Sequence, residues 1–302
     1  MCVGAQKGGT QWLYDQLCVH PEFWMPPLKE IRYFHGLPTG AVRRLYERAL
    51  ADLDGLNRQR AEEQHRPIDR GDIAFLRALL WLDERPRDVR EYAKLFNPKG
   101  DRLSGELTPF DATLPEERIA EIVAAFPSMK VFYIIRDPVE RFWSQYCMAA
   151  RREGRLELPT PERLAAFARE QPVASHSRPS EAVALWTRHV PPENFALSFF
   201  DDLEADPAGF RASILGFLGA DPARGTGVLP PGFNRKSVNP TIEMTPGVRW
   251  LVARMFADEL RRCAKRFGGP AEGWLARYAA ELAPPVQGGR PAAAPRGGRP
   301  AP

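Results

Sequence analysis

The chain has few cysteines and no long apolar run. Its four cysteines, Cys2, Cys18, Cys147 and Cys263, show no C-x-x-C spacing and no histidine partners at metal spacing, which argues against a zinc site and a disulfide framework. No stretch reaches the roughly 18 to 20 apolar residues of a membrane span, and no signal peptide precedes the first motif. Free thiols in a reducing compartment are the simplest explanation, so we expect a cytoplasmic protein without a membrane span.

The chain also lacks a strong charge of one sign. Its formal net charge is +4, and its arginines are scattered without the aromatic interleaving of a nucleic-acid surface. With 302 residues and 44% hydrophobic content it can bury one sizeable core. From about residue 284 it consists almost entirely of Pro, Gly, Ala and Arg, a composition that cannot form a core. We therefore expect one domain over residues 1–283 and a disordered tail over 284–302.

A glycine-rich turn stands almost at the start of the chain. The segment Gly4-Ala-Gln-Lys-Gly-Gly-Thr10 follows three residues of apolar strand and precedes an amphipathic helix. Such a turn presents backbone N–H groups and the positive end of a helix dipole to one point, which is typical of a phosphate site. Lys7 adds a mobile charge and Thr10 a hydroxyl. The alternative is a surface turn with a solvated lysine. Either the first strand is very short or the natural start lies upstream.

The turn differs from the P-loop of nucleotide hydrolases and kinases. Gly4 and Gly9 have the separation of G-x-x-x-x-G-K-[ST], but Thr10 stands where that motif has its lysine. Lys7 lies three residues earlier and faces a ligand differently. The pattern therefore argues against a kinase that uses ATP and Mg²⁺, which we keep as the alternative.

A second candidate half-site follows a buried strand. The run Met129–Ile135 is β-branched and aromatic, as in a parallel strand buried on both faces. Arg136 comes at its carboxyl end, where open α/β sheets bind ligands, and Pro138 suits the first turn of a helix that carries Ser144. A guanidinium and a hydroxyl together would clamp a phosphate. The alternative is an Arg136–Asp137 ion pair at the strand end, with Ser144 merely exposed.

Together the two motifs, G-x-x-K-G-G-T and R-D-P-x-E-R-x-x-S-x-Y, resemble those of sulfotransferases that use 3′-phosphoadenosine-5′-phosphosulfate (PAPS). The likeness is to the heparan-sulfate-type and bacterial branch. It implies an α/β, P-loop-like three-layer fold with a central parallel sheet flanked by helices. It also implies that the first loop binds the 5′ side of the nucleotide, through Lys7, Gly8, Gly9, Thr10, Gln11 and Trp12. The second motif would bind the 3′-phosphate, through Arg136 and Ser144.

Further segments extend the resemblance over about residues 1 to 260. Residues 27–34 are similar to the K-E-x-x-[FY]-F block of this branch, residues 105–110 to its E-x-[ST]-P-x-[YF] block, and residues 199–207 with 217–221 to its Y-E-D-L-x-x-D-P … F-L-G segment. The family closes a basic loop over the 3′-phosphate, and here that loop would supply Arg235, Lys236 and Ser237. A solvated loop is the alternative for these three residues.

Sulfuryl transfer needs charge stabilisation at the leaving oxygen and a base for the acceptor proton. Lys7 fits the first role. The resemblance assigns the second to Glu30, and a partly dry cleft would raise its pKa toward neutrality. The alternative is that Lys29 and Glu30 form a solvated ion pair without a catalytic role. His35 is the second candidate for the base. Glu106 would either reach the acceptor or form a structural hydrogen bond.

We therefore expect an enzyme that moves a sulfuryl group from PAPS, without a metal, to a hydroxyl of a small-molecule or carbohydrate acceptor, with an amine as second choice. Leu107 stands where the heparan-modifying enzymes have a lysine, which argues against a highly anionic polysaccharide. Besides the kinase, a catalytically inactive nucleotide-binding relative is the other alternative. We further expect helices over residues 40–96, 115–126, 181–190 and 245–267, a strand over 194–200, and no strand over 151–180.

Overall fold

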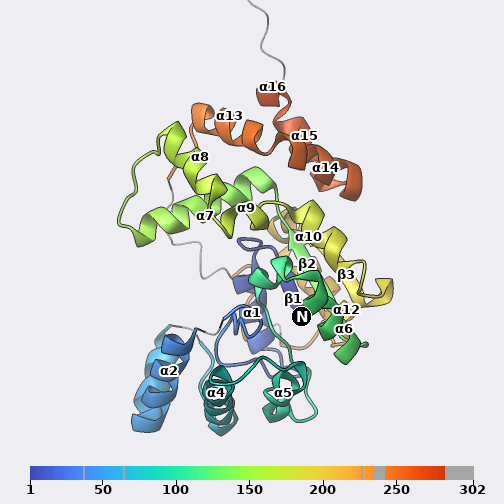
Figure 1. Cartoon of the computed structure of the whole chain (residues 1–302). Helices are drawn as coiled ribbons and strands as arrows, with labels where there is room; N and C mark the ends of the chain where they lie inside the picture. Colours follow the sequence, from blue (N-terminus) through green and yellow to red (C-terminus); the bar gives the residue numbers. More distant parts are fainter. Residues whose placement is uncertain (37, 64, 226, 234–241, 283–302) are drawn as a thin grey trace, which may run out of the picture.

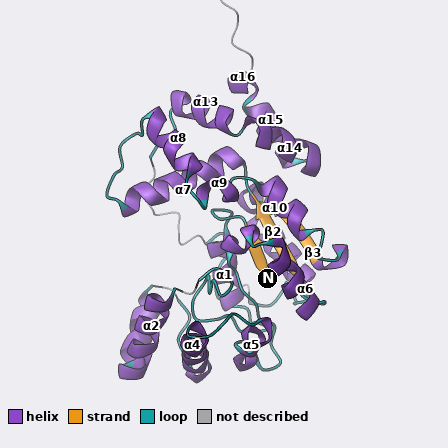
Figure 2. Cartoon of the chain, viewed as in Figure 1, coloured by secondary structure: helices purple, strands orange, loops and turns teal. Residues whose placement is uncertain are grey.

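A short parallel sheet lies at the centre of the molecule (Figures 1 and 2). The computed structural model describes residues 1–36, 38–63, 65–225, 227–233 and 242–282. Its strands are β1 (Cys2–Gly4), β2 (Val131–Ile135) and β3 (Phe195–Phe199), in the order β1-β2-β3. Cys2 pairs with Phe132, which in turn pairs with Ala196, and Leu107 adds an isolated parallel bridge to Cys2 on the outer side of β1.

Helices cover both faces of this sheet, which explains why β2 is an uninterrupted apolar run. Successive side chains of a strand point to opposite faces. Phe132 and Ile134 accordingly pack with α1 (Thr10–Cys18) and α12 (Pro207–Leu218), whereas Tyr133 and Ile135 pack in a second cluster with α6 (Glu116–Ala125), α7 (Pro138–Arg152) and α10 (Pro179–Trp186). The predicted α/β fold with a parallel sheet flanked by helices is confirmed.

The expected helices of residues 40–96 form a separate layer beside the sheet, at the bottom of Figure 1. Val42, Phe75, Leu79 and Tyr92 share its small core. Asp69 caps one of these helices reciprocally with Asp72. The elements are α2 (Thr39–Ala51), α3 (Leu53–Glu62), α4 (Arg70–Asp83), α5 (Val89–Lys94) and the 3-10 turn η1 (Asn97–Lys99).

The remaining segments carry the connections around the sheet and the C-terminal helices at the top of Figure 1. The expectation of no strand over residues 151–180 is confirmed. These elements are η2 (Pro109–Thr113), α8 (Pro161–Arg169), α9 (Val173–His176), η3 (Pro192–Asn194), α11 (Phe200–Ala205), α13 (Pro246–Met255), α14 (Ala257–Phe267), α15 (Pro270–Arg277) and α16 (Ala279–Leu282).

Two predicted boundaries were wrong. The single helix expected over residues 245–267 is broken at Phe256, whose backbone leaves the helical region at φ −109° and ψ 15°. Its ring packs on Phe142 of α7, with centroids 5.2 Å apart, and no glycine or proline marks the break in the sequence. The strand expected over 194–200 ends at Phe199, because Phe200 begins α11. Within the described ranges, no helix is both long and apolar enough to cross a membrane.

Candidate active site

The glycine-rich turn connects β1 to α1 and forms the first part of the site. The Ala5 amide donates to the carbonyl of Ile134 at 2.9 Å, and Lys7 and Gly9 adopt positive φ angles of 71° and 83°. A Cβ atom at Gly8 would lie 2.6 Å from the Ile134 carbonyl oxygen, so the loop needs a glycine there. Gly9 takes the N-cap position of α1, and among the described residues no side chain caps this helix. Its first amides therefore suit an anion.

Arg136 joins the second motif to the first. Its Nη1 donates to the carbonyl oxygen of Lys7 at 2.9 Å, and its guanidinium carbon lies 4.5 Å from the centroid of the Phe200 ring. A Cβ atom at Gly9 would contact the side chains of Leu203 and Phe200. We call Lys7, Gly8, Gly9, Arg136 and Phe200 the loop cluster. The burial of Arg136 lowers its pKa from the ordinary value.

The alternative of an ion pair between Arg136 and Asp137 is wrong. The carboxylate of Asp137 is buried and turned away, so that Oδ1 accepts from the Val139 amide at 2.9 Å and Oδ2 from the Tyr278 hydroxyl at 2.9 Å. The strand-end arginine is thus left to face the glycine-rich turn.

Lys7 contacts α7, the helix that carries Ser144. The Lys7 Nζ is 3.9 Å from the sulfur of Met148. Ser144 is half-buried and precedes Met148 by four residues, so the two share one face of α7. The structure therefore places Ser144 on the face of α7 that is turned toward the loop cluster.

Other predicted residues of this region have internal partners. The Gln11 amide donates to Asp15 at 3.0 Å, and the Trp12 indole donates to the Pro231 carbonyl at 2.6 Å while its ring packs edge-on against Phe210. Thr10 is buried at the start of α1. For Gln11 and Trp12, only the backbone amides are therefore candidates for ligand contacts. The predicted residues Arg235, Lys236 and Ser237 lie outside the described residues.

Glu30 lies on a distorted loop between α1 and α2. Its φ is 62° and that of Arg32 is 58°, an uncommon region for residues other than glycine. The Lys29 Nζ lies 2.6 Å from Glu30 Oε1, and Lys29 is only 12% exposed. The Lys29–Glu30 pair is therefore half-buried rather than freely solvated.

The side chain of Glu106 binds the backbone of this loop. It is 3% exposed, and its carboxylate accepts from the Arg32 amide at 3.0 Å and from the hydroxyls of Tyr92 and Thr108. Burial, followed by the charge of Asp111, raises the pKa of Glu106 to about 7. Of the two roles considered for Glu106, the structure shows the structural hydrogen bond.

Asp111 is a carboxylate that the sequence analysis missed. It is 0% exposed, neither oxygen has a hydrogen-bond partner in the described part of the chain, and the His35 Nε2 lies 3.3 Å from Oδ1. Burial and the charge of Glu30 raise the pKa of Asp111, whereas burial and the charge of Arg32 lower the pKa of His35. No motif marks Asp111, because its proximity to His35 arises only from tertiary packing. We call Glu30, His35, Glu106 and Asp111 the carboxylate cluster.

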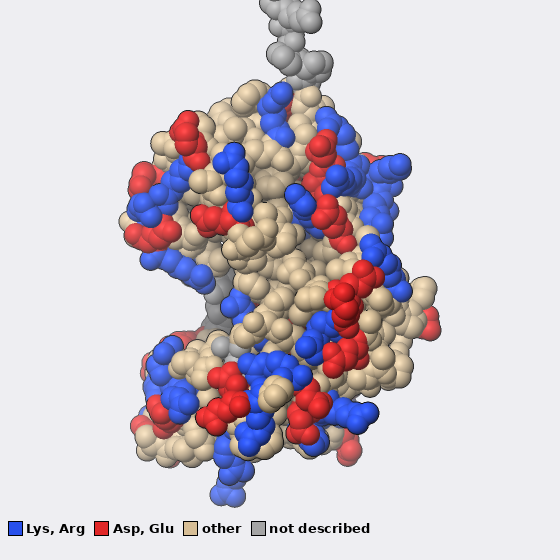
Figure 3. Space-filling view, in the orientation of Figure 1, with Lys and Arg blue, Asp and Glu red and all other residues tan. Residues whose placement is uncertain are grey.

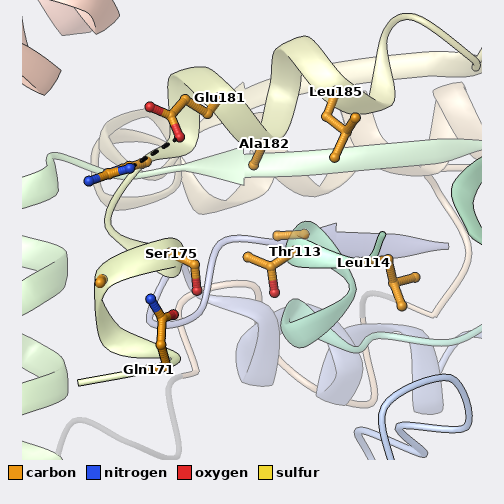
Figure 4. A pocket seen from close by; sticks show the side chains of 10 residues that line it. Thr113, Leu114, Gln171, Ser175, Glu181, Ala182 and Leu185 are labelled. Atoms are coloured by element: carbon orange, nitrogen blue, oxygen red, sulfur yellow. Dashed lines mark ion pairs between the residues drawn. The ribbon is translucent and has the colours of Figure 1, made fainter. Parts of the chain in front are cut away.

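A pocket borders η2 and α9 beside the carboxylate cluster (Figure 4). Thr113 of η2 and Ser175 of α9 lie on one side of it, and Ala182 and Leu185 of α10 lie on the other. His176, also of α9, packs edge-on against Phe110 with centroids 4.8 Å apart, and burial followed by the charge of Arg141 lowers its pKa to about 3. Figure 3 shows a larger hollow of the surface between the parts that carry α2 and α7, with Lys and Arg side chains on both margins. No group of three His, Cys, Asp or Glu side chains that could hold a metal occurs among the described residues, and the absence of a metal requirement stays a prediction.

Comparison with known proteins agrees with this arrangement. The sequence profile described as "Sulfotransferase family" matches residues 1–223, so the chain belongs to the sulfotransferase family. A sulfotransferase from Alicyclobacillus acidocaldarius is similar in structure, with a TM-score of 0.59 and 22% identity, over 90% of this chain and 96% of that one. The sulfotransferase domain of the Synechococcus PCC 7002 olefin synthase gives a TM-score of 0.49 and 17% identity, over 85% of this chain and 93% of that one. A search of curated proteins gave no match.

The family assignment confirms the sulfotransferase resemblance and makes the chain a transferase of sulfuryl groups by class. It does not favour the kinase alternative. The likeness to the A. acidocaldarius enzyme supports the fold. The heparan-sulfate-type branch and the roles of the individual site residues stay predictions.

Proposed function

We propose that this protein transfers the sulfuryl group of PAPS to a hydroxyl group, or as second choice an amine, of a small-molecule or carbohydrate acceptor. One observation carries the proposal: the guanidinium of Arg136 lies 2.9 Å from the carbonyl of Lys7, across 129 positions of sequence. The two motifs that the family resemblance assigns to the two ends of one nucleotide are therefore in contact.

The donor fits the loop cluster in shape and charge. Glycine at position 8 keeps the turn against the Ile134 carbonyl, and the uncapped first turn of α1 leaves amides for the 5′-phosphosulfate. Arg136 and Ser144, which lies on the face of α7 turned toward this cluster, would hold the 3′-phosphate, a group that ATP and AMP lack. A planar guanidinium suits such an oxyanion because it can donate two parallel hydrogen bonds.

In the proposed reaction the acceptor oxygen attacks sulfur while the bond from sulfur to the 5′-phosphate oxygen breaks. The products are the sulfated acceptor and adenosine 3′,5′-bisphosphate. The Lys7 ammonium would stabilise the negative charge that grows on the leaving oxygen. Lys7 lies in the turn that connects β1 to α1, beside the amides that would hold this phosphate.

The acceptor proton would pass to Glu30. Its carboxylate is one-third exposed and therefore within reach of an acceptor, whereas Glu106 and Asp111 are buried. His35 remains the rival base, because its side chain is 24% exposed and stands in front of the Asp111 carboxylate.

The acceptor and the location of the protein belong to the same proposal. Leu107 is 4% exposed and packs in the core beneath α1, which supports an acceptor other than a highly anionic polysaccharide. The four cysteines are free thiols, which supports the cytoplasmic location expected from the sequence.

Calorimetric titration of the full chain tests the donor. We expect metal-independent binding of adenosine 3′,5′-bisphosphate that is tighter than binding of AMP, and no comparable binding of ATP with Mg²⁺. Arg136→Ala should lower the affinity for the bisphosphate about 100-fold, the scale of a lost charged hydrogen-bonding group. The affinity for AMP should fall much less. An equal loss of affinity for both nucleotides would contradict the assignment of Arg136 to the 3′-phosphate. Preferential binding of ATP with Mg²⁺ would favour the alternative function, a kinase.

A further inference from the structure

The C-terminal helices reach back to the sheet beside Arg136. Trp274 and Tyr278 are both 0% exposed, and they belong to or directly follow α15. The Trp274 indole N–H donates to the Asp201 carboxylate at 3.0 and 3.2 Å. The Tyr278 hydroxyl donates to Asp137 Oδ2 at 2.9 Å. Two residues of one short segment thus bind aspartates that lie far apart in the sequence.

These two aspartates flank Arg136 on either side. Asp137 follows Arg136 directly at the end of β2, and Asp201 follows Phe200, whose ring lies against the Arg136 guanidinium. Both aspartates are close enough to Arg136 for their charges to favour its protonated form. The Trp274 ring also packs edge-on against Phe199 with centroids 5.6 Å apart, so it contacts the end of β3 as well as the start of α11.

The bonds to Asp137 divide its carboxylate between two structural elements. Oδ1 caps α7 through the Val139 amide, whereas Oδ2 accepts from Tyr278 and from Arg277 Nη1 at 3.2 Å. Without the second set of bonds, this buried carboxylate would lose partners that stabilise its charge, and it could turn toward the adjacent Arg136. An Arg136 paired with Asp137 would no longer present its donors to a phosphate.

The segment that provides these bonds lies outside the residues that match the sulfotransferase family profile, which ends at residue 223. The bonds are long-range, since Tyr278 and Asp137 are 141 positions apart. They come from fully buried side chains, which is the setting in which a hydrogen bond to a charged group has its largest effect.

We propose that Trp274 and Tyr278 are positioning residues for the donor site: by holding Asp201 and Asp137 they keep Phe200 and Arg136 in the arrangement that recognises the 3′-phosphate of the nucleotide. The C-terminal helices then support a site whose candidate ligand-binding residues in the two motifs, from Lys7 to Ser144, lie in the N-terminal half of the chain. This inference rests on the proposed function, because it takes Arg136 as the 3′-phosphate ligand.

The test uses Tyr278→Phe and Trp274→Phe in the full chain. Tyr14→Phe is the matched control, because the Tyr14 hydroxyl is also buried and donates to a carbonyl, that of Pro26, at 2.6 Å. We expect each positioning variant to weaken the binding of adenosine 3′,5′-bisphosphate about fivefold to tenfold, within the net range of one intramolecular hydrogen bond, while AMP binding changes less than about twofold. In turnover assays the KM for PAPS should rise by the same factor with kcat nearly unchanged. Tyr14→Phe should leave the ratio of the two nucleotide affinities as in the wild type.

Amide hydrogen exchange on the ligand-free protein gives a readout that needs no nucleotide. We expect faster exchange in both positioning variants over residues 135–140 and 200–205, and no such change in Tyr14→Phe. Unchanged exchange there, or an unchanged nucleotide ratio in variants of a wild type that does prefer the bisphosphate, would overturn the positioning role. If the wild type itself shows no preference for the 3′-phosphate, the proposed function fails, and the exchange data still decide whether the C-terminal segment orders these two junctions.

Discussion

The loop cluster and the carboxylate cluster differ in how they are built. The loop cluster presents backbone amides and the cations Lys7 and Arg136, and its shape comes from close backbone contacts. In the carboxylate cluster, burial raises the pKa values of Glu106 and Asp111 and so favours their neutral forms. The predicted anion site is thus encoded in short motifs, whereas the protonation of Glu106 and Asp111 depends on packing from many parts of the chain.

The largest effect is expected at Glu30. Glu30→Gln should leave the affinity for adenosine 3′,5′-bisphosphate unchanged, because Glu30 lies outside the loop cluster, and should lower turnover about 100-fold, the scale of a lost general base. Once an acceptor is found, kcat is measured for this variant alongside His35→Gln. If Glu30→Gln retains turnover and His35→Gln loses it, the base is His35, oriented by Asp111.

A smaller effect is expected at Gly8, which belongs to the loop cluster. Gly8→Ala places a methyl group 2.6 Å from the Ile134 carbonyl oxygen, so the turn must shift. We expect about a tenfold loss of nucleotide affinity and a destabilisation of about 1 to 3 kcal/mol, as for other overpacked sites. The control is Gly216→Ala in α12, where a Cβ atom meets nothing within 4 Å. Calorimetry and denaturant unfolding measure both quantities, and equal behaviour of the two variants would contradict the tight fit of the turn.

The effect on pH-dependent stability should be confined to the carboxylate cluster. The pKa of Glu106 is about 7 in the fold against 4.5 for a free glutamate. Since the folded state holds this proton more tightly, the contribution of Glu106 to stability is fully present below about pH 4.5 and is lost as the pH rises through 7. The loss is on the order of 3 kcal/mol.

Glu106→Gln should remove that pH dependence, because glutamine does not titrate. Unfolding free energies from denaturant titrations between pH 5 and pH 8 check this, with Glu116→Gln as the control, since Glu116 pairs with His189 and Arg188 on the surface. A slope that is the same in wild type and Glu106→Gln would show that Glu106 keeps an ordinary pKa.

The parts of the site that could be predicted from sequence are those with local signatures. The glycine-rich turn and the buried strand before Arg136 follow from residue patterns, the α/β class follows from the resemblance to sulfotransferases, and the structure has all three. The break at Phe256 could not be predicted, because it depends on the Phe142 ring of another helix. Asp111 was missed for the same reason, since its contact with His35 joins residues 76 positions apart.

Sequence alone indicated the class of the protein through the resemblance of its motifs to those of sulfotransferases, and it predicted an anion site from glycine, lysine and arginine near strand ends. The tertiary structure decided which neighbour each charge faces. Asp137 is turned to Tyr278 rather than to Arg136, Glu106 holds the Arg32 amide rather than reaching an acceptor, and Asp111 stands behind His35. These choices depend on burial and on long-range hydrogen bonds, since only the folded chain sets the distances and the solvation on which the energies of charged groups depend.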